Sequence, residues 1–146
     1  MTIHRLFSKD PNDEEENVTQ NIYVFRFILF CIIVYSFEML LNSVDIFIVD
    51  KTIFTRGYVT GCLFAAVYVL ILLHLGLEHP LTKYVSITAV SLIIMAASVS
   101  LTYHMIIIIM MPIIIAGMYT SKQLSIYTFV LTVLSIIIST YACLLY

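Results

Sequence analysis

Charged residues become scarce once the first twenty residues are passed. Between residues 21 and 146 the only Asp, Glu, Lys and Arg side chains are Arg26, Glu38, Asp45, Asp50, Lys51, Arg56, Glu78, Lys83 and Lys122. Apolar residues make up 62% of the chain and its mean hydropathy is +1.06, whereas a soluble domain averages about half apolar residues. Only lipid accommodates so much apolar surface in a chain of this size, so the sequence predicts a polytopic membrane protein.

Several other features are missing, and each absence excludes a class of protein. Residues 1–20 form a polar, acidic segment that is too short to bury a core of its own, and no basic surface suited to nucleic acid is present. The cysteines Cys31, Cys62 and Cys143 stand singly in apolar runs, without the spacing of a metal site. We interpret them as small buried hydrophobes, and we expect no metal, no cofactor and no nucleic-acid partner.

Catalytic motifs are also lacking. No nucleophile stands with a base and an orienting acid, and no phosphate-binding loop occurs, so we expect no enzymatic activity from these residues. A cleavable signal peptide is not predicted either, because the first apolar run begins after a polar stretch and has no small-residue cleavage site.

What the sequence does contain is a series of apolar runs. A transmembrane helix needs about 20 such residues, and the runs predict an all-α bundle of about five helices over 21–146, near residues 22–41, 57–75, 84–100, 101–119 and 124–145. The third and fourth runs are together too long for one crossing, so we place a turn near residues 98–102. Residues 42–56 are expected to form an interfacial loop or a short surface helix.

Lysine and arginine predict the orientation, because cytoplasmic loops carry an excess of both. With the N-terminus in the cytoplasm, the inner segments hold Arg5, Lys9, Arg26, Lys83 and Lys122, and the outer segments hold Lys51 and Arg56. A multi-pass protein with a cytoplasmic N-terminal segment is the prediction.

Four residues on the outer side are candidates for sensing a ligand or cue. Glu38 and Asp45 are seven residues apart and would share a helix face if the first helix continued, forming a cation or proton site. The alternative is that both carboxylates lie in water at the membrane boundary. Tyr103 and His104 open the fourth run, where an imidazole could sense pH or bind a ligand, or could simply bond to headgroups or water.

Two further features concern helix packing. Gly57, Gly61 and Ala65 form a stripe of small residues that allows close approach of another helix, either within the bundle or in a homodimer. Pro112 removes one backbone hydrogen bond and is expected to kink the fourth helix, as a hinge or as a passive bend.

Two segments resemble the membrane-embedded, N-terminal input domains of bacterial signalling proteins. They are Met39–Val59, which joins the first two helices, and Met110–Ser139, which leads into the last helix. The positions that carry the resemblance are Asn42, Phe47, Asp50, Lys51, Pro112, Tyr119 and Lys122. The resemblance implies a sensor half in a bacterial inner membrane, followed most often by a diguanylate cyclase and less often by a histidine kinase.

The end of the chain fits this interpretation. The last apolar run reaches Tyr146 without a polar tail, which is typical of the N-terminal portion of a longer protein, with a sixth helix and an output domain beyond it. A partner subunit could also carry the output, and a small complete membrane protein is the alternative. The rival functions are a small transporter or channel component and a structural membrane subunit.

Overall fold

A computed structural model of the chain describes residues 16–46, 49–100, 109–119 and 121–145. The elements in these ranges are all helices: α2 (Glu16–Ser43), α3 (Lys51–Leu75), α4 (Thr82–Ser100), α6 (Met111–Gly117) and α7 (Lys122–Leu145). The predicted all-α bundle is confirmed. Four helices, α2, α3, α4 and α7, are long and apolar enough to cross a membrane, which is the construction of a multi-pass membrane protein.

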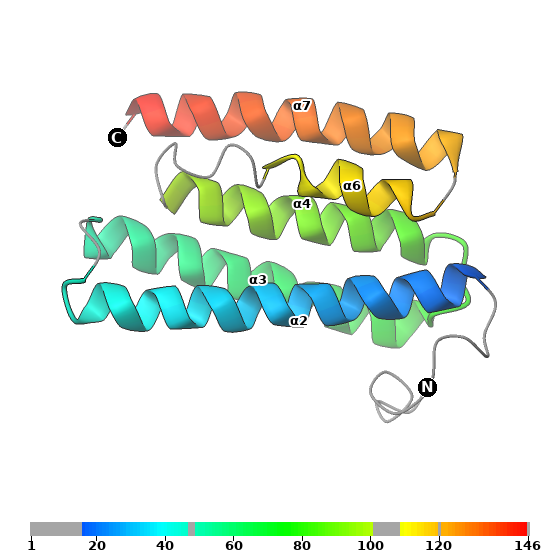
Figure 1. The fold of residues 1–146 in the computed structure, drawn as a ribbon, viewed down its shortest axis with the longest axis horizontal. Helices are drawn as coiled ribbons and strands as arrows, with labels where there is room; N and C mark the ends of the chain where they lie inside the picture. Colours follow the sequence, from blue (N-terminus) through cyan, green and yellow to red (C-terminus); the bar gives the residue numbers. More distant parts are fainter. Residues whose placement is uncertain (1–15, 47–48, 101–108, 120, 146) are drawn as a thin grey trace.

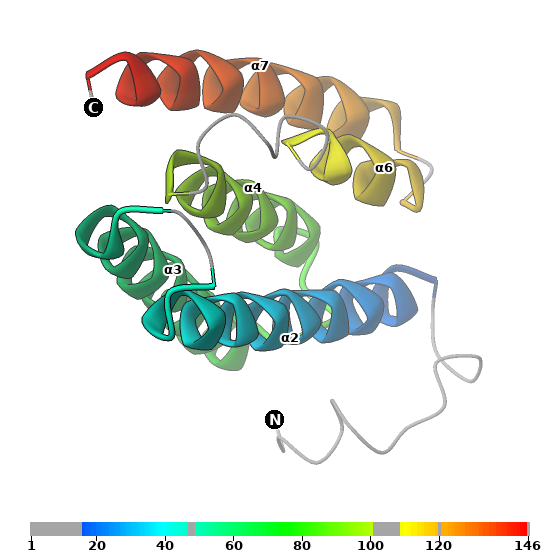
Figure 2. The same ribbon diagram turned by 60° about the vertical axis from the view of Figure 1, so that its left-hand side comes forward.

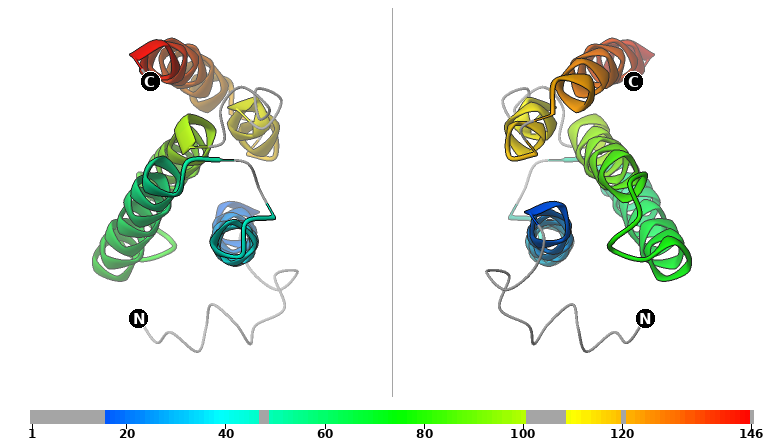
Figure 3. Two further views of the ribbon diagram at one scale, coloured as in Figure 1. Left: turned by 90° about the vertical axis from the view of Figure 1, so that its left-hand side faces the viewer. Right: turned by 90° about the vertical axis from the view of Figure 1, so that its right-hand side faces the viewer.

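The helices lie side by side along one direction (Figure 1). The start of α2, the α3–α4 connection and the start of α7 meet at one end of the bundle, which we call the N-end. The α2–α3 connection and the end of α4 lie at the opposite end. Turning the molecule shows α4 between α3 and α7, with α2 and α6 on the same side of α4 (Figures 2 and 3).

Small residues put α4 in the middle of the bundle. Its sequence, TKYVSITAVSLIIMAASVS, is rich in serine, threonine and alanine, and more than half of its residues are buried. Small side chains let neighbouring helices approach closely within a membrane. As a result α4 packs against α2, α3, α6 and α7.

The α3 helix begins earlier than the apolar run suggested. Asp50 precedes its first turn, and the Asp50 Oδ1 accepts hydrogen bonds from the N–H groups of Thr52 at 2.8 Å and Ile53 at 3.1 Å. Such an N-cap satisfies backbone donors that a helix start otherwise leaves open. The expected loop or surface helix at residues 42–56 is therefore wrong for residues 51–56, which are the first turns of α3.

The fourth predicted crossing is described only in part. Of residues 101–119, the structure gives the short helix α6, whereas residues 101–108 lie outside the described ranges. Pro112, predicted to kink a longer helix, stands in the first turn of α6, a position where proline is well tolerated. The predicted turn near residues 98–102 is not described as such: residues 98–100 are the last residues of α4, and residues 101 and 102 lie outside the described ranges.

Candidate functional site

Tyrosine hydroxyls join the helices to one another. Each of five tyrosines pairs its hydroxyl oxygen with a polar side chain of another element: Tyr35 with Ser100 (2.5 Å), Tyr58 with Ser36 (2.9 Å), Tyr68 with Ser86 (3.1 Å), Tyr127 with Thr88 (2.8 Å) and Tyr119 with Asn21 (2.8 Å). Hydrogen bonds of this kind hold helices together where water is absent. The pairs therefore set how each helix sits against its neighbours.

The direction of three of these bonds follows from the proton count. Ser36, Thr88 and Ser100 each donate their hydroxyl proton to a backbone carbonyl of their own helix. A hydroxyl has one proton to donate and two lone pairs that accept. The tyrosine is therefore the donor in these three pairs.

Asn21 ties three elements together at the N-end of the bundle. Its side chain is 2% exposed; the Nδ2 donates to the Leu77 carbonyl oxygen at 2.9 Å, and the Oδ1 accepts from the Tyr119 hydroxyl at 2.8 Å. The neighbouring Gln20 Nε2 donates to the Met118 carbonyl oxygen at 2.5 Å. The start of α2 is thereby fastened to the end of α6 and to the α3–α4 connection.

The stripe of small residues on α3 packs within the bundle. A Cβ on Gly57 would lie 2.6 Å from the Ser100 Cβ, and one on Gly61 would lie 3.3 Å from the Tyr35 ring. Ala65 is half-buried and packs against the main hydrophobic cluster. Close approach of α2 and α4 to α3 accounts for the glycines without a second copy of the chain.

Asp45 does not share a helix face with Glu38. The α2 helix ends at Ser43, and Asp45 has a φ of 61°, which takes its backbone out of the helix. Its carboxylate is exposed and lies 2.8 Å from the Lys51 Nζ. The expectation that Glu38 and Asp45 share a helix face is therefore wrong, and Asp45 is instead an exposed residue paired with Lys51.

Glu38 does lie in a concave site. It is half-buried on α2 and lines a groove of about 200 Å³ together with apolar side chains of α4, such as Ile94 and Ala97, and with Met111 of α6. It stands five residues before the end of α2, about 8 Å along the axis. A carboxylate at this depth in a membrane is costly unless it is paired or hydrated, so the groove is the candidate functional site.

The groove lies between α2 and α6, with α4 beneath it. They lie on the same side of α4, and at the N-end Gln20 and Asn21 of α2 bond to Met118 and Tyr119, which follow α6 (Figure 3). Toward the other end the walls of the groove are α2 side chains from Phe27 to Glu38 on one side and Met111 on the other, with α4 as the floor. The two helices are thus bonded at one end and separated by an apolar groove at the other.

Other predicted candidates lie elsewhere. Tyr103 and His104 fall outside the described residues. Within the described part of the chain, no cluster of three or more His, Cys, Asp or Glu side chains is placed to hold a metal ion.

The sequence analysis did not identify the paired tyrosines as residues that join helices. Tyr35 and Tyr68 lie well inside α2 and α3, although tyrosine in membrane helices is enriched at the two interfaces. A tyrosine far from both ends of a predicted span requires a partner for its hydroxyl, and that signal could have identified them. Their partners could not have been named, because Ser100 and Ser86 lie on another helix, 65 and 18 residues away in the sequence.

Comparison with protein-family models, with curated proteins and with solved structures gave no match to this chain.

Proposed function

We propose that this chain is the membrane-embedded input module of a bacterial signal-transduction receptor. The observation that carries the proposal is the position of Glu38, a half-buried carboxylate on the wall of an apolar groove between α2 and α6. An apolar molecule with a positive charge matches both the walls and the carboxylate. The cue is therefore a membrane-borne, lipophilic cation.

The bonds at the N-end supply a pivot. A ligand in the groove would push Met111 away from α2, while the bonds from Asn21 and Gln20 hold the far end of α6 in place. The α7 helix packs against α6 and follows it in the chain, so it would move with α6. The motion would then reach a cytoplasmic output domain, which the sequence resemblance suggests is a diguanylate cyclase or a kinase.

Such a mechanism has an energetic requirement. A ligand shifts an equilibrium between two arrangements only by the difference in its affinity for them. In the arrangement with Met111 displaced from α2, which we call open, the charged group of the ligand lies at Glu38 and the apolar part of the ligand fills the groove. These contacts give the ligand a higher affinity for the open arrangement. In the closed arrangement the ligand would have to leave the carboxylate or remain in lipid.

The polar pairs favour this function over the transporter or channel component. The five tyrosine pairs and Asn21 engage polar groups locally, between one helix and the next, rather than along a common path. A fixed packing role alone, as in a structural subunit, would give no reason for a carboxylate on an apolar groove. The input module therefore accounts for more of the observed contacts.

The proposal is tested in the full-length receptor with tetraphenylphosphonium as the lipophilic cation. Output activity should change with the cation in the native protein, and Glu38→Gln should reduce that response at least tenfold. Asp45→Asn is the matched control, because Asp45 is an exposed carboxylate at the same end of the bundle. An unchanged response in Glu38→Gln would refute the role of the groove.

The proposed orientation places the N-terminus and the α3–α4 connection in the cytoplasm. A cysteine at the exposed position Val44 should then react with a membrane-impermeant maleimide in intact cells. A cysteine at the exposed position Leu81 should react only after the membrane is opened. The reverse pattern would show that the chain is inserted the other way round.

A further inference from the structure

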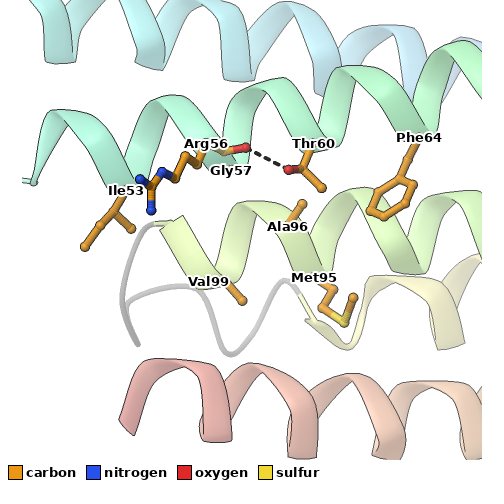
Figure 4. A pocket seen from close by; sticks show the side chains of 8 residues that line it. All are labelled: Ile53, Arg56, Gly57, Thr60, Phe64, Met95, Ala96 and Val99. Carbon is orange, nitrogen blue, oxygen red and sulfur yellow. Dashed lines mark hydrogen bonds between the residues drawn. The ribbon is translucent and has the colours of Figure 1, made fainter. Parts of the chain in front are cut away.

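A second hollow, independent of the Glu38 groove, lies between α3 and α4. It has a volume of about 270 Å³, and the two cavities share no lining residue. Arg56 and Ile53 stand at one end, Phe64 and Met95 at the other, and Thr60 and Ala96 between them (Figure 4). The cavity thus runs from a cationic end to an apolar end.

Arg56 and Thr60 also border a neighbouring surface depression. This depression has a volume of about 670 Å³ and is lined by Lys51 and by the threonines Thr52 and Thr55. The cavity between α3 and α4 offers apolar walls, and the surface depression offers cations and hydroxyls. Arg56 lines both. A molecule with an anionic head and an apolar chain would occupy both.

Arg56 forms no salt bridge among the described residues, although its charge acts through space on the Asp50 carboxylate. No carboxylate of the described residues lies within ion-pair distance of its guanidinium, whereas Lys51 already pairs with Asp45 at 2.8 Å. The Asp50 Oδ1 is occupied by two backbone N–H groups of α3. Guanidinium groups bind phosphate oxygens through two parallel hydrogen bonds, so Arg56 is suited to a phosphate.

The depth of these residues matches the depth of a lipid. Arg56 is in the second turn of α3, about 8 Å from the helix start, where an arginine reaches the headgroup region. Phe64 lies eight residues further, about 12 Å deeper along the axis. An acyl chain that entered beside Arg56 would therefore extend toward the membrane centre past Phe64 and Met95.

We infer that the α3–α4 cavity binds an anionic phospholipid of the surrounding bilayer, with its phosphate on Arg56 and one acyl chain beside Phe64 and Met95. This goes beyond the proposed function, and it holds whether or not the Glu38 groove senses a cation.

Phosphatidylglycerol and phosphatidylcholine with identical chains test the inference on the purified protein in a neutral detergent. Phosphatidylglycerol should raise the melting temperature saturably, and phosphatidylcholine should not. Arg56→Gln should weaken the apparent affinity for phosphatidylglycerol roughly tenfold or more, because a charge-assisted hydrogen bond is lost. Lys122→Gln is the charge control, since it removes an exposed cation at the other end of the bundle.

A second pair of variants tests the cavity itself. Thr60→Phe places a ring at the rim of the cavity and should weaken binding, whereas Leu63→Phe adds a ring to an exposed position of the same helix and should not. Soluble glycerol phosphate should give no stabilisation, which separates a lipid site from a phosphate site.

Photo-crosslinking supplies a readout that does not depend on stability. A phosphatidylglycerol with a photoactivatable acyl chain should label the peptides that contain Phe64 and Met95, and Arg56→Gln should reduce this labelling. Equal stabilisation by both lipids, equal losses in Arg56→Gln and Lys122→Gln, or labelling confined to other helices would each overturn the inference.

Discussion

The Tyr119 hydroxyl makes one of the hydrogen bonds that join distant parts of this fold. Its side chain is buried, and the hydroxyl donates to the Asn21 Oδ1 across 98 residues of sequence. In a membrane protein, where the unfolded state also finds hydrogen-bond partners, such a bond contributes about 0.5–1.5 kcal/mol.

Replacing Tyr119 by phenylalanine removes this hydroxyl and keeps the ring. We expect the free energy of unfolding to fall by about 1 kcal/mol, because the buried Asn21 carbonyl loses its donor. Reversible unfolding in mixed detergent and SDS micelles measures the change. Tyr23→Phe is the matched control, because Tyr23 is 42% exposed, and an equal loss in both variants would contradict the importance of the Asn21 bond.

Gly57 is the second residue with a sharply defined role. Gly57→Ala would place a Cβ 2.6 Å from the Ser100 Cβ and 2.7 Å from its Oγ, so α3 and α4 must move apart. Overpacking of this kind costs about 1–3 kcal/mol, and the same unfolding measurement should show it.

Gly117 provides the comparison for Gly57. A Cβ there meets nothing within 4 Å, so Gly117→Ala should be neutral or stabilise α6 by up to about 1 kcal/mol. If Gly57→Ala and Gly117→Ala behaved alike, the contact between Gly57 and Ser100 would not be tight.

At the scale of the element, the start of α3 depends on the ionisation of Asp50. The N–H groups of Ile53 and Thr52 bond to its carboxylate and hold its pKa below the usual value. A lowered folded-state pKa means that the charged group stabilises the fold. That contribution is complete above the unfolded pKa of about 4 and is lost as the pH falls through the lower folded value.

Asp50→Asn separates the charge from the cap. Asparagine still accepts hydrogen bonds at an N-cap but does not ionise, so the variant should lose the acid-dependent part of the stability change. Asp50→Ala should lower the melting temperature at neutral pH as well, because no acceptor remains. Melting temperatures measured between about pH 3 and pH 7 in detergent check both, and the same acid dependence in Asp50→Asn as in the native protein would assign the effect to another group.

The helices themselves were largely predictable from the sequence, for a simple reason. In lipid every backbone polar group must be hydrogen-bonded, and a helix achieves this within one segment, so a continuous apolar run of about 20 residues predicts a helix. Their ends were harder to predict, because Asp50 extends α3 by local hydrogen bonds that the apolar pattern does not contain. The site was harder still: Glu38 was identified as a candidate, but its groove requires α2, α4 and α6 to meet, and no local pattern contains that information.

At the scale of the whole molecule, the bundle has a part held by several contacts and a part held at one end. Tyr35 and Ser36 fasten α2 to α4 and α3, and the buried ring of Phe54 packs edge-on against Tyr35 with ring centres 5.4 Å apart. By contrast, α6 is short, and the hydrogen bonds that tie it to α2 among the described residues are made at the N-end of the bundle by Met118 and Tyr119, which follow α6. A ligand in the Glu38 groove should therefore move α6 and leave the packing of α2 on α3 unchanged.

A distance measurement between α2 and α6 tests this most directly. Spin labels at Ile33 and Ile114, both exposed, would report the width of the groove by pulsed electron resonance, on a chain whose native cysteines are replaced by alanine. The account predicts that tetraphenylphosphonium lengthens this distance, that Glu38→Gln abolishes the change, and that a control pair at Ile33 and Leu63 on α2 and α3 stays constant. An unchanged distance between Ile33 and Ile114, or the same change in Glu38→Gln, would contradict it.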